Sequence, residues 1–163
     1  MSDVYESFDF NVSGQYFTAD LVYDHDTGAP WDESEGHGVV SEWTTRAKAP
    51  GELILAKDGR ARRFYALAGS IAIAKRDGWD SAPYGKLGET AGQRAERAAR
   101  ADYEYLRAWC NDSWFYCGVI VRKAGSCACC AASESLWGVE SNGDYPREVA
   151  LELAAEMMDS IAA

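Results

Sequence analysis

The fold is decided by the stretch AGQRAERAARADYEYLRAWCNDSWFYCGVIVRK, residues 91–123, in which the hydrophobic period changes from helical to extended. From Gln93 to Cys110 the apolar and small residues recur at helical spacing, which is typical of a helix with one packed stripe. Asn111-Asp112 ends this pattern. Residues 114–121 are then apolar at consecutive positions, as in a strand that is buried on both faces. The stretch therefore predicts a surface helix followed by a central strand.

The chain after this stretch predicts a second strand and a closing helix. Gly125-Ser126 indicates a turn, and residues 136–140 (LWGVE) return as an antiparallel partner of the central strand. Asp144 is a suitable N-cap for a final amphipathic helix. The predicted buried stripe of that helix consists of Val149, Leu153, Ala154, Met157 and Ile161. We expect residues 91–163 to form an α-β-β-α block.

The first 90 residues predict strands, a loop and a short helix. Two alternating runs, residues 8–12 and 17–23, predict a β-hairpin, and an acidic loop then extends to Gly38. Further along we expect short strands at 39–43 and 53–55 and a helix at 67–75 that Gly78 closes. Because 163 residues suffice for one core, we predict a single α+β domain over residues 1–163, an antiparallel sheet with helices packed on it.

The charge of the chain is unevenly distributed. The net charge is −10, with ten acids and no base in residues 1–42, an excess of bases in residues 43–130, and seven acids against one base in residues 131–163. Such asymmetry bears on partners and solubility more than on fold. The sequence has no apolar run of about 18 residues and no signal-peptide pattern, and an odd count of five cysteines fits a reducing compartment. We therefore expect a cytoplasmic protein with no membrane partner.

Five short segments carry a resemblance to a known family. They are Gly36-His37-Gly38, Pro50-Gly51-Glu52, Arg62-Arg63-Phe64-Tyr65, Arg76-Asp77-Gly78-Trp79 and Ser135-Leu136-Trp137-Gly138-Val139-Glu140-Ser141. Together they make most of the chain resemble a family of small proteins of tailed bacteriophages and prophages of proteobacteria, and residues 135–141 with the acidic C-terminal helix are the most specific part. The resemblance implies a phage origin more than a mechanism. Small acidic phage proteins outside the virion are often inhibitors of host systems, which is an association by family and not by site.

Acidic and aromatic residues around the predicted loop form the first candidate site, for partner binding. They are Asp24, Asp26, Trp31, Asp32, Glu33, Glu35 and Trp43. Carboxylates can imitate the phosphates of nucleic acid and compete for basic grooves, and tryptophans are enriched at binding hot spots. We hypothesise a non-enzymatic phage protein, anti-CRISPR-like, that inhibits or redirects a host protein or nucleoprotein complex. The sequence leaves its oligomeric state open.

Two groups of residues are candidates for metal binding. His25 and His37 with the nearby acids could hold a divalent ion, as in a metal-dependent hydrolase or nuclease, which is the alternative function. Cys127, Cys129 and Cys130 could bind zinc with Cys110 or Cys117 as a fourth thiolate, although the first spacing is one residue shorter than in usual zinc sites. We favour a solvated loop and buried thiols, and assign no metal, cofactor or catalytic residue.

A basic segment in the middle of the chain is the third candidate. It comprises Lys57, Arg60, Arg62, Arg63, Phe64, Tyr65, Lys75 and Arg76, followed by Arg94, Arg97 and Arg100. Basic residues between aromatic ones can bind phosphates and stack bases, which would suit a nucleic-acid-binding accessory protein. Because the whole chain repels nucleic acid, we expect these bases to pair with the acidic ends and do not expect direct nucleic-acid binding.

Overall fold

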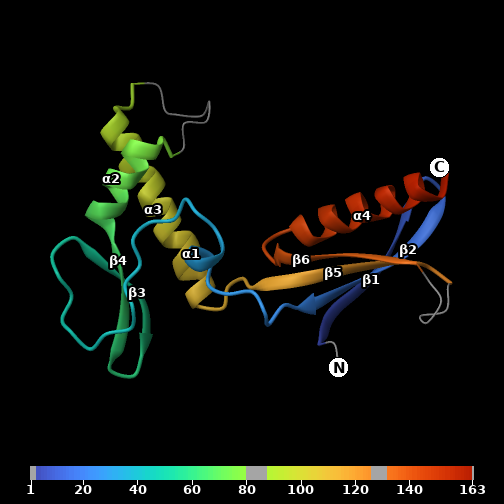
Figure 1. The fold of residues 1–163 in the computed structure, drawn as a ribbon, viewed down its shortest axis with the longest axis horizontal. Coiled ribbons are helices and arrows are strands. Elements are labelled where there is room, and N and C mark those ends of the chain that lie inside the picture. Colours follow the sequence, from blue (N-terminus) through green and yellow to red (C-terminus); the bar gives the residue numbers. More distant parts are fainter. Residues whose placement is uncertain (1–2, 80–87, 126–131, 163) are drawn as a thin grey trace. The chain divides into compact units, whose positions relative to one another are not determined.

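A computed structural model describes residues 3–79, 88–125 and 132–162 of the chain (Figure 1). It divides into two compact units, Met1–Thr27 with Trp114–Ala163 as unit 1 and Gly28–Ser113 as unit 2. None of the helices in the described residues is long and apolar enough to cross a membrane. The α+β class is confirmed, because antiparallel strands and helices both contribute to the structure.

Unit 1 is a four-stranded antiparallel sheet with one long helix (Figure 1). Its elements are β1 (Val4–Val12), β2 (Gln15–Tyr23), β5 (Tyr116–Lys123), β6 (Ser133–Glu140) and α4 (Tyr145–Ala162). The strand order is β1-β2-β5-β6, so that both predicted hairpins are confirmed and β5 is a central strand. The pairing of β2 with β5 joins the two ends of the chain.

The core of unit 1 lies between this sheet and α4. Phe17, Ala19 and Leu21 of β2 alternate with polar residues and are buried with Val119 of β5 against α4. This is the period-two pattern of a strand with one covered face. Four of the five predicted stripe residues of α4, Val149, Leu153, Ala154 and Met157, are buried. On the other face of β5, a Cβ on Gly118 would lie 2.6 Å from the Trp137 ring, which explains why this strand has no side chain there.

Unit 2 joins a two-stranded hairpin to two helices. Its elements are α1 (Pro30–Glu33), β3 (Glu52–Asp58), β4 (Ala61–Ala66), α2 (Leu67–Asp77) and α3 (Ala91–Cys110). Helices α2 and α3 pack side by side, and Leu55, Tyr65 and Leu106 form the centre of the core (Figure 1). Gly78 ends α2 with a φ of 67°, as predicted, because a left-handed residue suits glycine. Thr90 begins α3 with a capping box.

Three sequence predictions need correction or completion. Residues 39–43 form no named strand, only the isolated bridge of Val40 with Tyr65. The partner of β3 is instead β4, where Arg62 and Arg63 concealed the strand pattern. The order helix, strand, strand, helix at the end of the chain is confirmed, but α3 belongs to unit 2 and the rest of that block to unit 1. The expectation of one domain stays a prediction.

Candidate functional site

The acidic part of the predicted partner site begins in unit 1 with a carboxylate that has a structural role. Asp24 Oδ1 accepts hydrogen bonds from the backbone N–H groups of Asp26 and Thr27 at 3.1 and 3.2 Å, and Oδ2 accepts from the Thr27 hydroxyl at 2.7 Å and from Gly138 N at 3.0 Å. Burial alone would raise the pKa of Asp24, but these hydrogen bonds lower it. Asp24 therefore joins the end of β2 to β6, and Asp26 is the exposed acid of the pair.

The remaining acids of the predicted site lie in unit 2, around α1. Glu33 Oε1 accepts a hydrogen bond from Gly28 N at 2.8 Å and so closes the turn that precedes the helix. Asp32 and Glu35 are exposed and have no ion pair with any described residue. The predicted acidic surface is thus made of two kinds of residue. Asp26, Asp32 and Glu35 are available to a partner, whereas Asp24 and Glu33 stabilise the loop.

A half-buried polar network attaches this loop to α3. His37 Nδ1 lies 2.6 Å from Asp102 Oδ1, and Asp102 Oδ2 accepts hydrogen bonds from Gly38 N and from the Tyr65 hydroxyl, both at 2.8 Å. The Tyr65 hydroxyl also lies 2.9 Å from Ala99 O, and its single proton is shared between the two acceptors. Burial and the Asp102 carboxylate raise the pKa of Tyr65, so that the hydroxyl remains a donor. Sequence reasoning missed Asp102, which is 65 residues from His37.

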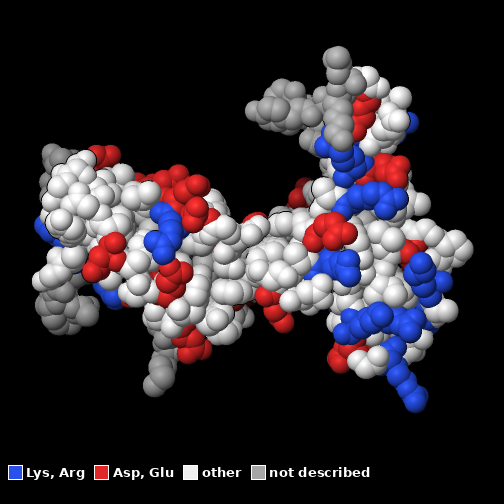
Figure 2. Space-filling view, turned by 180° about the vertical axis from the view of Figure 1, so that it is seen from behind, with Lys and Arg blue, Asp and Glu red and all other residues white. Residues whose placement is uncertain are grey.

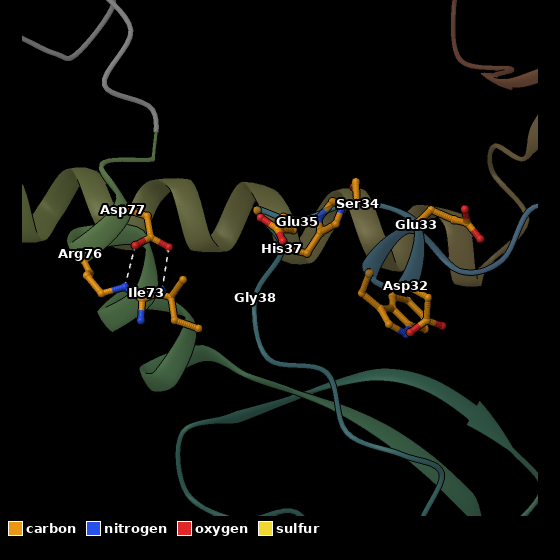
Figure 3. A pocket seen from close by; sticks show the side chains of 11 residues that line it. Asp32, Glu33, Ser34, Glu35, His37, Gly38, Ile73, Arg76 and Asp77 are labelled. Atoms are coloured by element: carbon orange, nitrogen blue, oxygen red, sulfur yellow. Dashed lines mark hydrogen bonds and ion pairs between the residues drawn. The ribbon is translucent and has the colours of Figure 1, made fainter.

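Beside this network lies a polar hollow of about 460 Å³ (Figure 3). Its lining comprises residues 31–38 from α1 and the following loop, with Ile73, Arg76 and Asp77 from α2. Arg76 Nε donates to Asp77 Oδ1 at 2.6 Å, so that this arginine is already neutralised (Figure 3). An imidazole oriented by a carboxylate is one part of a nucleophilic site. No hydroxyl or thiol of the described residues hydrogen-bonds to His37, however, and the network serves to hold the loop.

The two predicted metal candidates are not supported by the described residues. His25 Nε2 lies 3.4 Å from Asp3 Oδ2 on the surface of unit 1, and His37 is engaged with Asp102 in unit 2. Over residues 3–79, 88–125 and 132–162 no group of three or more His, Cys, Asp or Glu residues could hold a metal ion. Cys127, Cys129 and Cys130 lie outside the described residues. Cys117 and Cys110 have free thiols, and burial raises the pKa of both.

The two tryptophans of the predicted site do converge, on an arginine. The Arg63 guanidinium carbon lies 5.0 Å from the Trp31 ring centre and 5.1 Å from that of Trp43. Trp109 of α3 packs edge-on against Trp31 at 5.5 Å. These residues line a hollow of about 340 Å³. The sequence places Trp31 and Trp43 in one candidate site and Arg63 in another. The contact between them depends on strand β4, which the sequence pattern did not predict.

The hairpin β3–β4 is the basic region of unit 2. Lys57 is directly opposite Arg62 in the register, a pairing of like charges that is unfavourable in a sheet. Neither residue, nor Arg60 or Arg63, forms an ion pair with a described acid. Other arginines of the unit do: Arg76 pairs with Asp77, Arg97 with Glu89 and Arg100 with Glu96. For the arginines of this segment the predicted pairing with the acidic ends of the chain is therefore wrong, because their partners are local; Arg122 of β5, which pairs with Asp20, is the described base of residues 43–130 that does pair with an acidic end.

The net charge of the chain belongs entirely to unit 1. Unit 1 contains three bases and thirteen acids, whereas unit 2 contains thirteen of each. Two of the three bases of unit 1 are neutralised, Arg122 by Asp20 and Arg147 by Glu6. Figure 2 shows the segregation on one face: the lysines and arginines gather mostly over unit 2. The sequence shows that both ends of the chain are acidic, but not that the two ends belong to the same unit.

Comparisons with protein-family models, curated proteins and solved structures found no match. The resemblance to phage proteins stays a prediction, as does the cytoplasmic location. The functional argument rests on three features of the chain itself: the acidic unit 1, the His37–Asp102 network and the hollow around Arg63.

Proposed function

We propose that the chain is a non-enzymatic protein of phage or prophage origin that binds a basic host factor through unit 1. The observation that carries this proposal is the confinement of the whole net charge of −10 to that unit. A surface of one sign raises association rates with an oppositely charged partner and repels nucleic acid. The partner class is a cytoplasmic host protein or nucleoprotein complex that handles nucleic acid, as in an anti-defence role.

Helix α4 supplies the most regular part of the acidic surface. Its exposed carboxylates are those of Glu148, Glu152, Glu156 and Asp159, and none forms an ion pair with a residue that the structure describes. Residues four apart on a helix are separated by about 6 Å along its axis, so that the first three acids form a regular row.

The acids of this row repel one another along the helix. Like charges four residues apart cost a few tenths of a kcal/mol each. Glu148 lies in the first turn, where an acid favours the helix dipole, but Asp159 lies in the last turn and opposes it, and that turn has no base to compensate. Repulsion that no described base relieves is typical of a functional surface. The row therefore favours α4, rather than the loop around α1, as the surface that meets a basic groove.

The proposal is tested by capture from nuclease-treated lysate of the bacterial host, using the purified chain as bait. We expect recovery of a basic nucleic-acid-binding protein at about 50 mM salt and its loss at about 500 mM, because screening shortens from about 14 to about 4 Å. Added duplex DNA should displace the bait from the recovered partner. Recovery that DNA does not affect, or no recovery at low salt, contradicts the proposal.

A further inference from the structure

Arg63 has hydrogen-bond donors without acceptors. Its guanidinium carries five N–H groups, and the buried Nε has no hydrogen-bond partner. Its described contacts are instead with the rings of Trp31 and Trp43. Cation–π contact holds a guanidinium in place without using its N–H groups, which lie in its plane. Its terminal nitrogens likewise make no hydrogen bond or ion pair with a described residue, and because Arg63 lines a hollow, these nitrogens are the donors that an acceptor from outside the unit can reach.

The hollow next to Arg63 suits an anion attached to a flat, apolar group. Its volume of about 340 Å³ is within the range of small-ligand sites. Trp43 and Trp109 supply aromatic surface, and Trp43 is 46% exposed. Cys110 also lines the hollow, and burial raises the pKa of its thiol, so that it provides no negative charge to neutralise the arginine. Among the described residues of the lining the one acid is Asp58, which has no ion pair with Arg63.

A second hollow extends the basic surface along β3. It has a volume of about 510 Å³, and its lining includes Lys48, Lys57 and Arg107 without any acid. The two hollows share Ala56 and Lys57, so that they adjoin at this point of the strand. When further basic side chains lie next to an anion site, the surface can bind a ligand with more than one phosphate, such as a nucleic-acid strand.

We propose that unit 2 binds a nucleoside phosphate at Arg63, with the phosphate accepting hydrogen bonds from the guanidinium and the base lying against the exposed indole of Trp43. Arginine forms paired hydrogen bonds with phosphate oxygens, and base–aromatic stacking tolerates any base. The ligand is a free nucleotide or one unit of a single strand, which present the same chemistry. Repulsion of nucleic acid is a property of unit 1, since unit 2 is neutral overall.

The test is binding of fluorescein-labelled oligothymidylate to the full chain, measured by fluorescence anisotropy at low salt. Unlabelled oligothymidylate, thymidine monophosphate and inorganic phosphate serve as competitors. Arg63→Lys keeps the charge but removes the planar donors, and Trp43→Ala removes the stacking surface. The matched control is Arg100→Lys, because Arg100 is exposed on α3 and paired with Glu96. Circular dichroism checks that the variants are folded.

We expect Arg63→Lys and Trp43→Ala each to weaken binding by about tenfold, while Arg100→Lys binds as the wild type does. Thymidine monophosphate should compete at lower concentration than inorganic phosphate. If the unlabelled oligonucleotide competes at a lower concentration per phosphate than thymidine monophosphate, the ligand is the strand; if the two compete equally per phosphate, it is the free nucleotide. The proposal is overturned if the wild-type Kd for the oligonucleotide is above about 1 mM, or if the folded Arg63→Lys and Arg100→Lys variants bind with equal affinity. It is also overturned if inorganic phosphate competes as well as thymidine monophosphate does.

Discussion

Replacing Asp102 with alanine should destabilise unit 2 more than any change on its acidic loop. The Asp102 side chain is 9% exposed and accepts hydrogen bonds from Gly38 N and Tyr65 Oη, with its other oxygen 2.6 Å from His37 Nδ1. In the alanine variant Tyr65 can still donate to Ala99 O, but the Gly38 and His37 donors lose their acceptor. An unsatisfied buried donor costs about 1–3 kcal/mol, and because both of these donors are half-buried beside the polar hollow, we expect a total loss at the lower end, about 2 kcal/mol.

Urea unfolding followed by tryptophan fluorescence measures this loss. With a slope of about 1–3 kcal/mol per M, a loss of about 2 kcal/mol lowers the midpoint by about 0.7–2 M. Hydrogen exchange should accelerate at the Gly38 amide, and the strands of unit 1 provide an internal control. Asp32→Ala is the matched variant, since Asp32 is exposed without an ion pair among the described residues, and it should change stability by less than about 0.5 kcal/mol. Equal stabilities of the Asp102 and Asp32 variants would refute the role given to the network.

Two further predictions concern charge and capping in unit 2. Two hydrogen bonds from Arg46, with a third from Ala49 N, lower the pKa of Glu52 from 4.5 to about 2. The stability that this carboxylate contributes is therefore present above about pH 4.5 and is lost as the pH falls toward 2. Glu52→Gln should lose less stability than the wild type on acidification through this window, and a Glu52 pKa near 4.5 by NMR would contradict the reasoning. Thr90→Ala removes the side chain that accepts from Gln93 N at 3.2 Å, and should cost about 1 kcal/mol in urea unfolding, whereas no change would show that α3 does not depend on its cap.

Periodicity predicted most elements of the fold because their burial follows the chain locally. The hairpins β1–β2 and β5–β6 and the helices α2, α3 and α4 are all present in the structure. Strand β4 was missed because Arg62 and Arg63 interrupt its apolar pattern, and the strand predicted at 39–43 makes only the isolated bridge of Val40 with Tyr65. A local pattern carries no information about pairing between distant segments. It could not show that β2 pairs with β5, which creates the separate acidic unit.

The candidate sites also depend on contacts between distant residues, which the sequence pattern does not show. The carboxylates of Asp24 and Glu33 cannot be distinguished in sequence from their solvated neighbours, but each accepts a hydrogen bond from a backbone N–H group. Trp31 and Trp43 border the loop and both contact Arg63, and a partner for them stays a prediction. Their common contact, Arg63, depends on the register of β3 with β4, which no spacing in the sequence reveals.

The most direct test of the acidic-unit proposal compares two charge-reversed variants for affinity to the recovered host partner. One carries Glu148→Lys, Glu152→Lys and Glu156→Lys on α4, and the other carries Asp32→Lys, Glu35→Lys and Glu42→Lys in unit 2. All six residues are exposed, and both variants change the net charge equally, so that steering by total charge affects them alike. The account predicts that the α4 variant loses at least about tenfold in affinity at about 50 mM salt and that the unit 2 variant loses much less. Equal losses, or a larger loss from the unit 2 variant, would contradict it.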